Sequence, residues 1–348
     1  MSLFEHPDFD QHEQVSFFKD ESTGLEAIIA VHNTALGPSV GGCRMYPYVS
    51  SAEALTDVLR LSQSMTYKAA MAGLPQGGGK AVIIGNPHTD KNETLMRAMG
   101  SAVDTFKGAY IVAEDSGISV GDVKHMGKQT QHTGGTHAHF SYDGGVADGN
   151  PAPATAYGVF VGIKAAVDWH FQSDLRGKTV AIQGLGHVGL RLARHLHKAG
   201  AKLVVSDVFE ERVNIVKKEL GAQVVAPDLI HSVEADVFSP CALGGAISPT
   251  TLPSIKAKII AGAANNQISD TKLGQAILNE GIIYVPDYVI NAGGIIDIHH
   301  QNHSSTAEKL KKHLLKIGDT IQLILDKSKS DDMPTTTIAN NLAEQKFA

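Results

Sequence analysis

Cysteine, long apolar runs and runs of basic residues are scarce or absent in this sequence. Cys43 and Cys241 are the 2 cysteines among 348 residues, and their wide separation excludes both a disulfide scaffold and a metal site of clustered cysteines. No apolar stretch reaches the roughly 18 residues that a transmembrane helix needs. The first residues are acidic and polar, unlike the basic and apolar start of a signal peptide. We therefore expect a cytoplasmic protein without a membrane partner.

The charge balance excludes a second class of partner. Lys and Arg together number 30 against 36 Asp and Glu, which gives a formal net charge of −6. No basic stretch offers a surface for phosphate backbones, so we expect no nucleic-acid partner. Hydrophobic residues make up 43% and charged residues 19%, as in ordinary globular proteins. A chain of this length predicts two domains.

The first part of the sequence predicts an α/β domain. Ser50 and Glu53 have the spacing of a capping box, and apolar residues follow at helical intervals; a second helix is expected at 93–106. Three short β-branched and apolar segments are expected to be strands: 25–32, 80–84 and 110–113. We assign 1–148 to this domain. Gly149 to Pro153 interrupts the pattern, and we expect the hinge there.

Alternation of strands and helices after the hinge predicts a parallel sheet of the Rossmann type in 149–330, with 331–348 as a tail. Helices are expected at 154–168, 187–199 and 210–220, and strands at 178–183, 202–206, 223–225, 236–238, 258–261 and 282–284. A last helix is expected after a second capping box, Ser305 to Glu308, with an apolar stripe from Leu310 to Ile324. The predicted fold class is α/β with two domains.

A glycine-rich segment follows the strand at 178–183. It reads Gly184, Gly186, His187, Val188 and Gly189 in the spacing G-x-G-x-x-G and opens a helix, as in dinucleotide-binding turns. The next strand ends in Asp207, whose carboxylate is placed to accept hydrogen bonds from ribose hydroxyls. The Asp207 carboxylate would repel a 2′-phosphate, and no Lys or Arg that could bind this phosphate follows before Arg212. The pattern therefore favours NAD over NADP. The alternative is an ordinary tight turn with a solvated aspartate.

Two lysines and a carboxylate mark the first domain. Lys68 lies on the first expected helix, and Lys80 follows Gly77, Gly78 and Gly79 at the start of an apolar strand. A phosphate loop is excluded, because that motif needs glycine at the position of Leu74 and Ser or Thr at the position of Ala81.

The surroundings of these groups predict their chemistry. A desolvated Lys80 near Lys68 would have a depressed pKa and could transfer protons. Asp115 follows the strand at 110–113, where ligand sites open in such sheets. The alternative is that all three are solvated.

Eight motifs in order resemble the Glu/Leu/Phe/Val amino acid dehydrogenases, most closely the leucine type. The resemblance runs from about residue 12 to residue 325, and its motifs are Met65 with Lys68, 77–80, 113–115, 150–158, 183–189, 239–245, 261–266 and 286–294. It implies NAD-dependent oxidative deamination of an L-amino acid to a 2-oxo acid and ammonia. It also implies a cleft between a catalytic and a Rossmann lobe, and a homo-oligomer, either dimer or octamer.

The resemblance also implies residue roles. Lys80 and Asp115 would be catalytic, Lys68 would hold the substrate carboxylate, and Thr155, Ala242 and Asn265 would lie beside the nicotinamide. The remaining substrate contacts would come from residues that line the side-chain pocket or approach the substrate: Val40, Gly41, Gly42, Met65, Asn266, Ile295 and Ile298. Because this pocket is mostly aliphatic, a branched-chain substrate, with leucine favoured, is expected over phenylalanine or tryptophan.

Three questions stay open at this stage. The segment from Thr133 to Gly149 departs from the leucine-type pattern, so one pocket position near Gly134 is undefined. His137, His139, His299, His300 and His303 form a group, but without a carboxylate or cysteine partner we expect surface histidines and no metal. A catalytically silent dinucleotide sensor and a hydroxy-acid dehydrogenase are the alternative functions; a sensor would not need the two lysines and the aspartate together.

Overall fold

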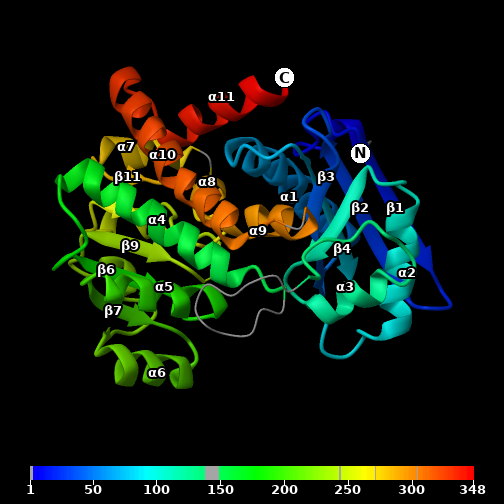
Figure 1. Cartoon of the computed structure of the whole chain (residues 1–348), viewed down its shortest axis with the longest axis horizontal. Helices are drawn as coiled ribbons and strands as arrows, with labels where there is room; N and C mark the ends of the chain where they lie inside the picture. Colours follow the sequence, from blue (N-terminus) through cyan, green and yellow to red (C-terminus); the bar gives the residue numbers. More distant parts are fainter. Residues whose placement is uncertain (1–2, 138–148, 243, 271, 304) are drawn as a thin grey trace.

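The chain folds into two sheets that are covered by helices and lie side by side (Figure 1). The computed structural model describes residues 3–137, 149–242, 244–270, 272–303 and 305–348. The N-terminal part of the chain forms one lobe, and a parallel sheet with its helices forms the other. No helix in these ranges is both apolar and long enough to traverse a bilayer.

The N-terminal lobe is built on a five-stranded mixed sheet of order β1-β2-β4-β3-β5. Its strands are β1 (Gln14–Asp20), β2 (Leu25–Asn33), β3 (Ser39–Tyr46), β4 (Gly77–Ile84) and β5 (Tyr110–Glu114). Strands β4, β3 and β5 are parallel, so their carboxyl ends meet at one edge. Helix α1 (Ser51–Met71) packs on β4 and β2, and α2 (Glu93–Asp104) and α3 (Val120–Met126) complete the lobe. The Ser50 side chain accepts a hydrogen bond from Glu53 N at 3.2 Å, which confirms one half of the predicted capping box, whereas the Glu53 carboxylate accepts from Val49 N at 2.8 Å.

The glycines before Lys80 form part of the strand, which the sequence analysis expects to begin only at residue 80. Strand β4 begins at Gly77, and a Cβ added to Gly78 would lie 2.0 Å from the backbone nitrogen of Thr66 in α1. Glycine therefore allows α1 to approach the sheet closely. Strands β1 and β3 are also absent from the sequence prediction.

The Rossmann lobe has a six-stranded parallel sheet of order β11-β10-β9-β6-β7-β8. Its strands are β6 (Thr179–Gln183), β7 (Lys202–Ser206), β8 (Gln223–Val224), β9 (Val237–Pro240), β10 (Ile259–Ile260) and β11 (Ile283–Tyr284). Helices α4 (Ala152–Phe171), α5 (His187–Lys198), α6 (Glu210–Leu220) and α7 (Leu273–Asn279) belong to this lobe. These elements confirm the predicted alternation, and the chain order reverses between β6 and β9, where such sheets bind ligands.

Four helices complete the chain: α8 (Asp287–Ile290), α9 (Gly293–Asn302), α10 (Ala307–Asp331) and α11 (Thr335–Phe347). The predicted stripe of α10 is buried against α4. The predicted cap at Ser305 is wrong by one residue, because the side chain of Thr306 accepts from Lys309 N at 3.3 Å.

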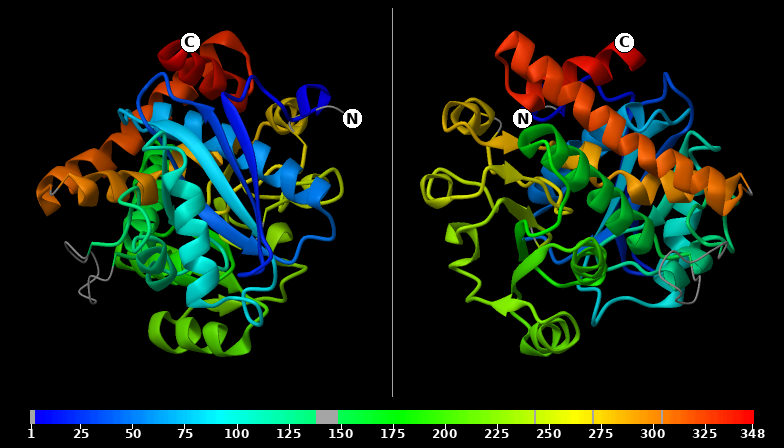
Figure 2. Two further views of the ribbon diagram at one scale, coloured as in Figure 1. Left: turned by 90° about the vertical axis from the view of Figure 1, so that its right-hand side faces the viewer. Right: turned by 60° about the vertical axis from the view of Figure 1, so that its left-hand side comes forward.

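Helix α11 occupies the segment that the sequence presents as a tail. It returns to the N-terminal lobe and packs along α1 (Figure 2), where Tyr67 Oη donates to Glu344 Oε1 at 2.8 Å.

Candidate active site

The lysines and the carboxylate predicted from the sequence meet where the two lobes face each other. Lys80, near the start of β4, places Nζ 2.7 Å from Asp115 Oδ2, and only 7% of its side chain is exposed. Asp115 directly follows β5 at the edge where the parallel strands end. Lys68 lies on α1, and its Nζ donates to Asn265 Oδ1 of the Rossmann lobe at 3.3 Å. These charged groups therefore connect the lobe that is predicted to bind the substrate with Asn265, a residue predicted to lie beside the nicotinamide.

Asp115 is held in its ionised form. Burial raises its pKa, but the neighbouring cations Lys80 and Arg44 outweigh burial and hold the pKa well below its usual range. Arg44 Nε lies 3.1 Å from Asp115 Oδ2. The sequence prediction did not include Arg44, which lies on β3 two residues after Gly42.

Lys68, the second lysine of this cluster, has a lowered pKa. Burial lowers the pKa of Lys68 to about 8, with Asp287 and Asp115 opposing this shift and Lys80 adding to it. At neutral pH the Lys68 ammonium therefore remains mostly protonated and can bind a carboxylate.

A small apolar cluster lies beside these charged groups. Val40, Ala113 and Ile298 are buried against one another, with Ile111 packed on them. A Cβ added to Gly134 would lie 3.0 Å from Ile298 Cγ2, so the side chain of Ile298 already fills the space beside this glycine. The structure thus brings two predicted pocket residues together, Val40 and Ile298, and adds two that the sequence analysis did not assign to the pocket, Ala113 and Ile111.

Met65 and Ile295, two other residues that were predicted to line the pocket, do not belong to this apolar cluster. Ile295 belongs to the large core that includes residues of both lobes, and Met65 packs against that core. Gly41 and Gly42, predicted to let the substrate lie close to the backbone, also have a packing reason to be glycine. An added Cβ would lie 1.7 Å from Gly79 O at Gly41 and 2.7 Å from Asp115 Cβ at Gly42, so neighbouring protein atoms occupy that space.

The glycine-rich turn has the geometry of a dinucleotide site. Gly184 has a φ of +94°, and a Cβ there would lie 2.8 Å from Ala242. At Gly186 an added Cβ would meet nothing within 4 Å, so this backbone is open to a ligand. A Cβ on Gly189 would lie 2.0 Å from Gly184 O, which explains the third glycine. No side chain caps α5, so its first amide groups can bind a pyrophosphate. The turn therefore fits a nicotinamide dinucleotide.

Asp207 lies beside this turn with a side chain only 5% exposed. Its Oδ2 accepts from Leu185 N at 2.6 Å and its Oδ1 from Phe209 N at 2.8 Å, while Arg212 Nη1 is 3.7 Å from Oδ2. The carboxylate thus also shapes the turn itself. Each oxygen has a second lone pair, so ribose hydroxyls can still bind it.

Two of the predicted nicotinamide contacts lie beside groups already described: Asn265 beside Lys68, and Ala242 beside the glycine-rich turn. Asn265 Oδ1 accepts from Asn291 Nδ2 at 2.8 Å as well as from Lys68, which fixes the orientation of this amide. Thr155 Oγ1 donates to Pro151 O at 2.9 Å, and Ala242 contacts the glycine turn.

Three further residues were predicted to make contacts: His187 and Val188 with the cofactor, and Asn266 with the substrate. His187 and Val188 form the exposed and half-buried start of α5. Asn266 has a left-handed φ of 51°, and its carbonyl accepts from Gly245 N at 2.7 Å.

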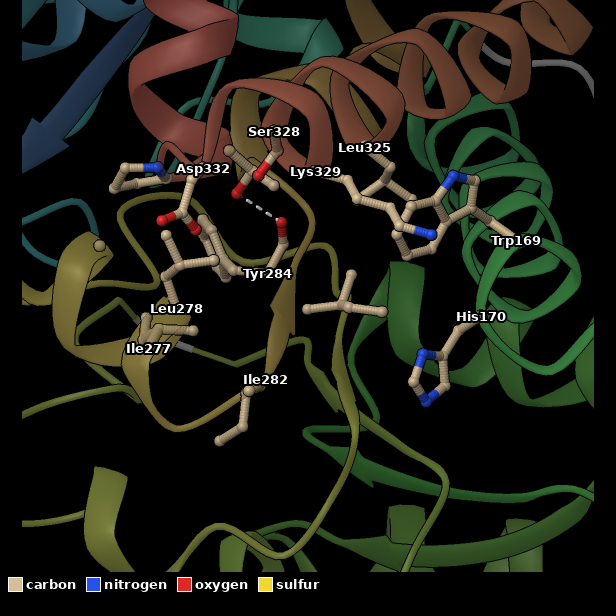
Figure 3. Close-up of a pocket in the computed structure, with 15 residues that line it drawn as sticks. Trp169, His170, Ile277, Leu278, Ile282, Tyr284, Leu325, Ser328, Lys329 and Asp332 are labelled. Carbon is tan, nitrogen blue, oxygen red and sulfur yellow. Dashed lines mark hydrogen bonds between the residues drawn. The ribbon is translucent and has the colours of Figure 1, made fainter.

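A separate cavity of about 330 Å³ lies away from these groups (Figure 3). It runs between Trp169 and His170 at the end of α4 and Leu278 of α7 with Asp332 after α10. None of the predicted site residues lines it.

The histidines on α9 make hydrogen bonds within the protein. His300 Nε2 lies 3.1 Å from His313 Nδ1, and His303 Nδ1 lies 2.8 Å from His299 O. His139 lies outside the described residues. Within the described ranges no three His, Cys, Asp or Glu side chains form a group that could hold a metal ion.

Comparison with protein-family models decides the relationship of this chain. Residues 12–132 match the Glu/Leu/Phe/Val dehydrogenase dimerisation domain, and residues 144–209 and 205–348 match the Glutamate/Leucine/Phenylalanine/Valine dehydrogenase domain. The chain belongs to the Glu/Leu/Phe/Val dehydrogenase family. The predictions of this family and of its two-domain α/β fold are confirmed.

Relatives in this family cover nearly the whole chain. A leucine dehydrogenase of Geobacillus stearothermophilus is 47% identical over 100% of this chain and 94% of its own length. An L-tryptophan dehydrogenase of Nostoc punctiforme is 45% identical over 100% of this chain and 97% of its own. A phenylalanine dehydrogenase of Lysinibacillus sphaericus is 43% identical over 96% and 88%.

Solved structures of the Glu/Leu/Phe/Val dehydrogenase family share the fold. The Nostoc punctiforme L-tryptophan dehydrogenase superposes with a TM-score of 0.81 at 43% identity, covering 97% of this chain and 96% of that one. A hetero-hexameric glutamate dehydrogenase of Thermus thermophilus has a TM-score of 0.79 at 20% identity, covering 97% and 88%. At that identity the second comparison supports the fold alone.

Proposed function

We propose that this chain is an NAD-dependent leucine dehydrogenase that converts an L-amino acid, NAD and water into a 2-oxo acid, ammonia and NADH. The observation that carries the proposal is the Lys80–Asp115 ion pair beside Lys68, which itself contacts Asn265 of the Rossmann lobe. A sensor would need the glycine turn but not this charged cluster. An assay of NADH formation with a panel of L-amino acids tests the reaction.

In this proposal the charged residues divide the work. The Lys68 ammonium binds the substrate carboxylate and fixes the α-carbon. Asp115, held ionised, takes a proton from the substrate ammonium and later moves protons between water and the leaving nitrogen. The bound nicotinamide ring supplies the oxidation by accepting the hydrogen and electron pair of the α-carbon. Lys80 donates a hydrogen bond to the oxygen that water brings to the iminium carbon, which stabilises the charge that develops there.

The substrate side chain is proposed to enter at the Val40, Ala113 and Ile298 cluster. These side chains are aliphatic, and Ile298 fills the space beside Gly134 that a phenyl or indole ring would need. This favours leucine and other branched chains. Phenylalanine or tryptophan is the second candidate, since dehydrogenases named for those amino acids are also 43–45% identical to this chain.

Ile298→Ala is expected to raise the ratio of kcat/KM for phenylalanine to that for leucine by about tenfold or more, because a missing aliphatic group changes discrimination by about 1–3 kcal/mol. Steady-state kinetics with both amino acids measure the ratio. Ile255→Ala, which removes the same atoms from a different core cluster, is the matched control and should leave the ratio unchanged. A wild-type preference for phenylalanine or tryptophan over leucine would overturn the assignment of leucine and leave the reaction class intact.

NAD is proposed as the cofactor because Asp207 lies beside the turn that would hold the adenosine ribose. A 2′-phosphate would meet this carboxylate, and like charges placed together cost several kcal/mol, so kcat/KM with NAD should exceed that with NADP by about a hundredfold or more. Asp207→Ser should narrow this ratio, whereas Asp228→Ser, at an exposed position of the same lobe, should not. Reduction of NADP at least as efficient as that of NAD would refute the assignment.

The matched dimerisation domain, residues 12–132, supports the proposal that the chain forms a homo-oligomer, either dimer or octamer. A cytoplasmic location and the division into domains at 1–148 and 149–330 remain parts of the same proposal. Sedimentation of the full chain measures the oligomeric state.

A further inference from the structure

Arg44 connects Asp115 to the helix that carries Lys68. Its Nε lies 3.1 Å from Asp115 Oδ2, and its Nη1 lies 2.9 Å from Asp57 Oδ2. Asp57 is on α1, three helical turns before Lys68 and on the same face, because 11 residues advance an α-helix by close to three full turns. Arg44 is therefore a bridge between β3, α1 and the end of β5.

The far end of this bridge is also anchored. Tyr48 Oη donates to Asp57 Oδ2 at 2.6 Å, so Asp57 has two donors on one oxygen. The near end is closely packed: a Cβ at Gly42 would lie 2.7 Å from Asp115 Cβ, so β3 passes Asp115 at a distance that only glycine permits. The guanidinium and carboxylates are each about one-fifth to one-quarter exposed, with side-chain exposures of 21% for Arg44, 26% for Asp57 and 20% for Asp115.

Both cations at Asp115 contact the same atom. Lys80 Nζ lies 2.7 Å from Oδ2, the oxygen that also accepts from Arg44. Lys80 and Arg44 thus both hold Oδ2, and the backbone N–H of Ser116 also donates a hydrogen bond to this carboxylate. We propose that Arg44 is a positioning residue, which with Lys80 holds Asp115 by Oδ2 so that Oδ1 faces the substrate nitrogen and the attacking water. This inference rests on the proposed function and adds a residue to it.

A guanidinium is required here for a geometric reason. It presents separate N–H groups along a rigid plane, so Nε and Nη1 can bind two carboxylates at once, which the single ammonium of lysine cannot do with the same geometry. Arg44 also acts through its charge, because the positive guanidinium lowers the pKa of Asp115. The charged and titratable groups that face Asp115 from the packed elements are Lys80 on β4, Arg44 and Cys43 on β3, Lys68 and Asp57 on α1, Tyr110 on β5, and Tyr48.

The test separates charge from geometry through four variants of the full chain. Arg44→Met should lower kcat for leucine by about a hundredfold, as expected for a displaced catalytic group. It should also move the acidic limb of kcat/KM to higher pH by about one unit, because removing a nearby positive charge raises the pKa of Asp115. Arg44→Lys should keep the limb near its wild-type position and still lose part of kcat. Asp57→Asn removes a negative charge, so its limb should move to lower pH while kcat falls.

Arg60→Met is the matched control, because Arg60 pairs with Asp8 on an exposed part of α1 and should affect neither quantity. An Arg44→Met enzyme with near-wild-type kcat and an unmoved limb would overturn the inference. If Arg44→Met and Arg44→Lys lose kcat equally and the acidic limb of kcat/KM moves in neither, Arg44 has only a structural role. That result would also overturn the inference. If Arg44→Met does not fold, the remaining two variants decide: the acidic limb should stay in place in Arg44→Lys and move to lower pH in Asp57→Asn, and a limb that stays in place in both would overturn the inference. Failure of the proposed function itself is distinct, because the wild-type chain would then form no NADH with any amino acid.

Discussion

Replacing Lys80 with alanine is expected to lower kcat for leucine by about a thousandfold or more, while NADH still binds. Loss of a positioned proton-transfer group costs about 10²–10⁴ in rate, and loss of a donor to a developing oxyanion costs about 10²–10³. Lys80 is buried and 2.7 Å from Asp115, so its removal also takes away one of the two cations that hold this carboxylate. The cofactor is unaffected because its turn lies in the other lobe. Steady-state kinetics measure kcat, and NADH fluorescence measures binding.

Lys19→Ala is a suitable comparison for the Lys80 variant. Lys19 forms an exposed ion pair with Glu26 on the first hairpin, so its loss should leave kcat unchanged. Lys80→Gln preserves much of the side-chain volume and should be as slow as Lys80→Ala if the amine is what matters. Near-wild-type turnover in both Lys80 variants would exclude Lys80 from the chemistry.

Lys68→Ala is expected to raise the KM for leucine by about a hundredfold, with a smaller effect on kcat. Hydrogen bonds to charged groups contribute about 1.5–3 kcal/mol, and the carboxylate is bound in both the ground state and the transition state. A variant with unchanged KM would show that the carboxylate binds elsewhere. Arg60→Ala, on the exposed face of the same helix, is the control for an effect on α1 itself.

The pH dependence of KM gives Lys68 an independent signature. Because burial lowers its pKa to about 8, the ammonium is protonated below this pH and becomes neutral above it. Carboxylate binding should therefore be complete below about pH 8 and weaken as the pH rises, so the wild-type KM should climb on the alkaline side. In Lys68→Ala this climb should disappear. An identical alkaline rise in both proteins would assign it to another group.

The Rossmann lobe could be predicted from sequence because its signals are local. Gly184, Gly186 and Gly189 each satisfy a steric requirement within a few residues of chain, and Asp207 follows at the end of the next strand. The parallel alternation follows from hydrophobic periodicity alone. Lys68, Lys80 and Asp115 could be selected because charged residues at the ends of apolar elements are unusual.

The N-terminal lobe is harder to predict because its glycines are required by contacts with residues that are distant in the sequence. Glycine normally argues against a strand interior, yet Gly78 and Gly79 are inside β4, since α1 and Tyr110 occupy the space that their side chains would take. Strand β3 was missed for the same reason at Gly41 and Gly42. Which atoms fill that space depends on tertiary packing, which the sequence does not state.

Two further features depend on contacts between remote segments. Arg44 meets Asp115 across 71 residues, and Tyr67 meets Glu344 across 277. No local sequence pattern pairs these residues, so sequence analysis alone does not find Arg44 and presents the segment of α11 as a tail. Ile298 could be named from the family resemblance, but its contact with Gly134 required the structure.

The most direct test of the account is the wild-type protein mixed with NAD and each of leucine, isoleucine, valine, phenylalanine and tryptophan, with NADH and released ammonia measured together. The account predicts equal amounts of NADH and ammonia, with kcat/KM highest for leucine and the other branched chains. Absence of NADH with every L-amino acid would contradict it.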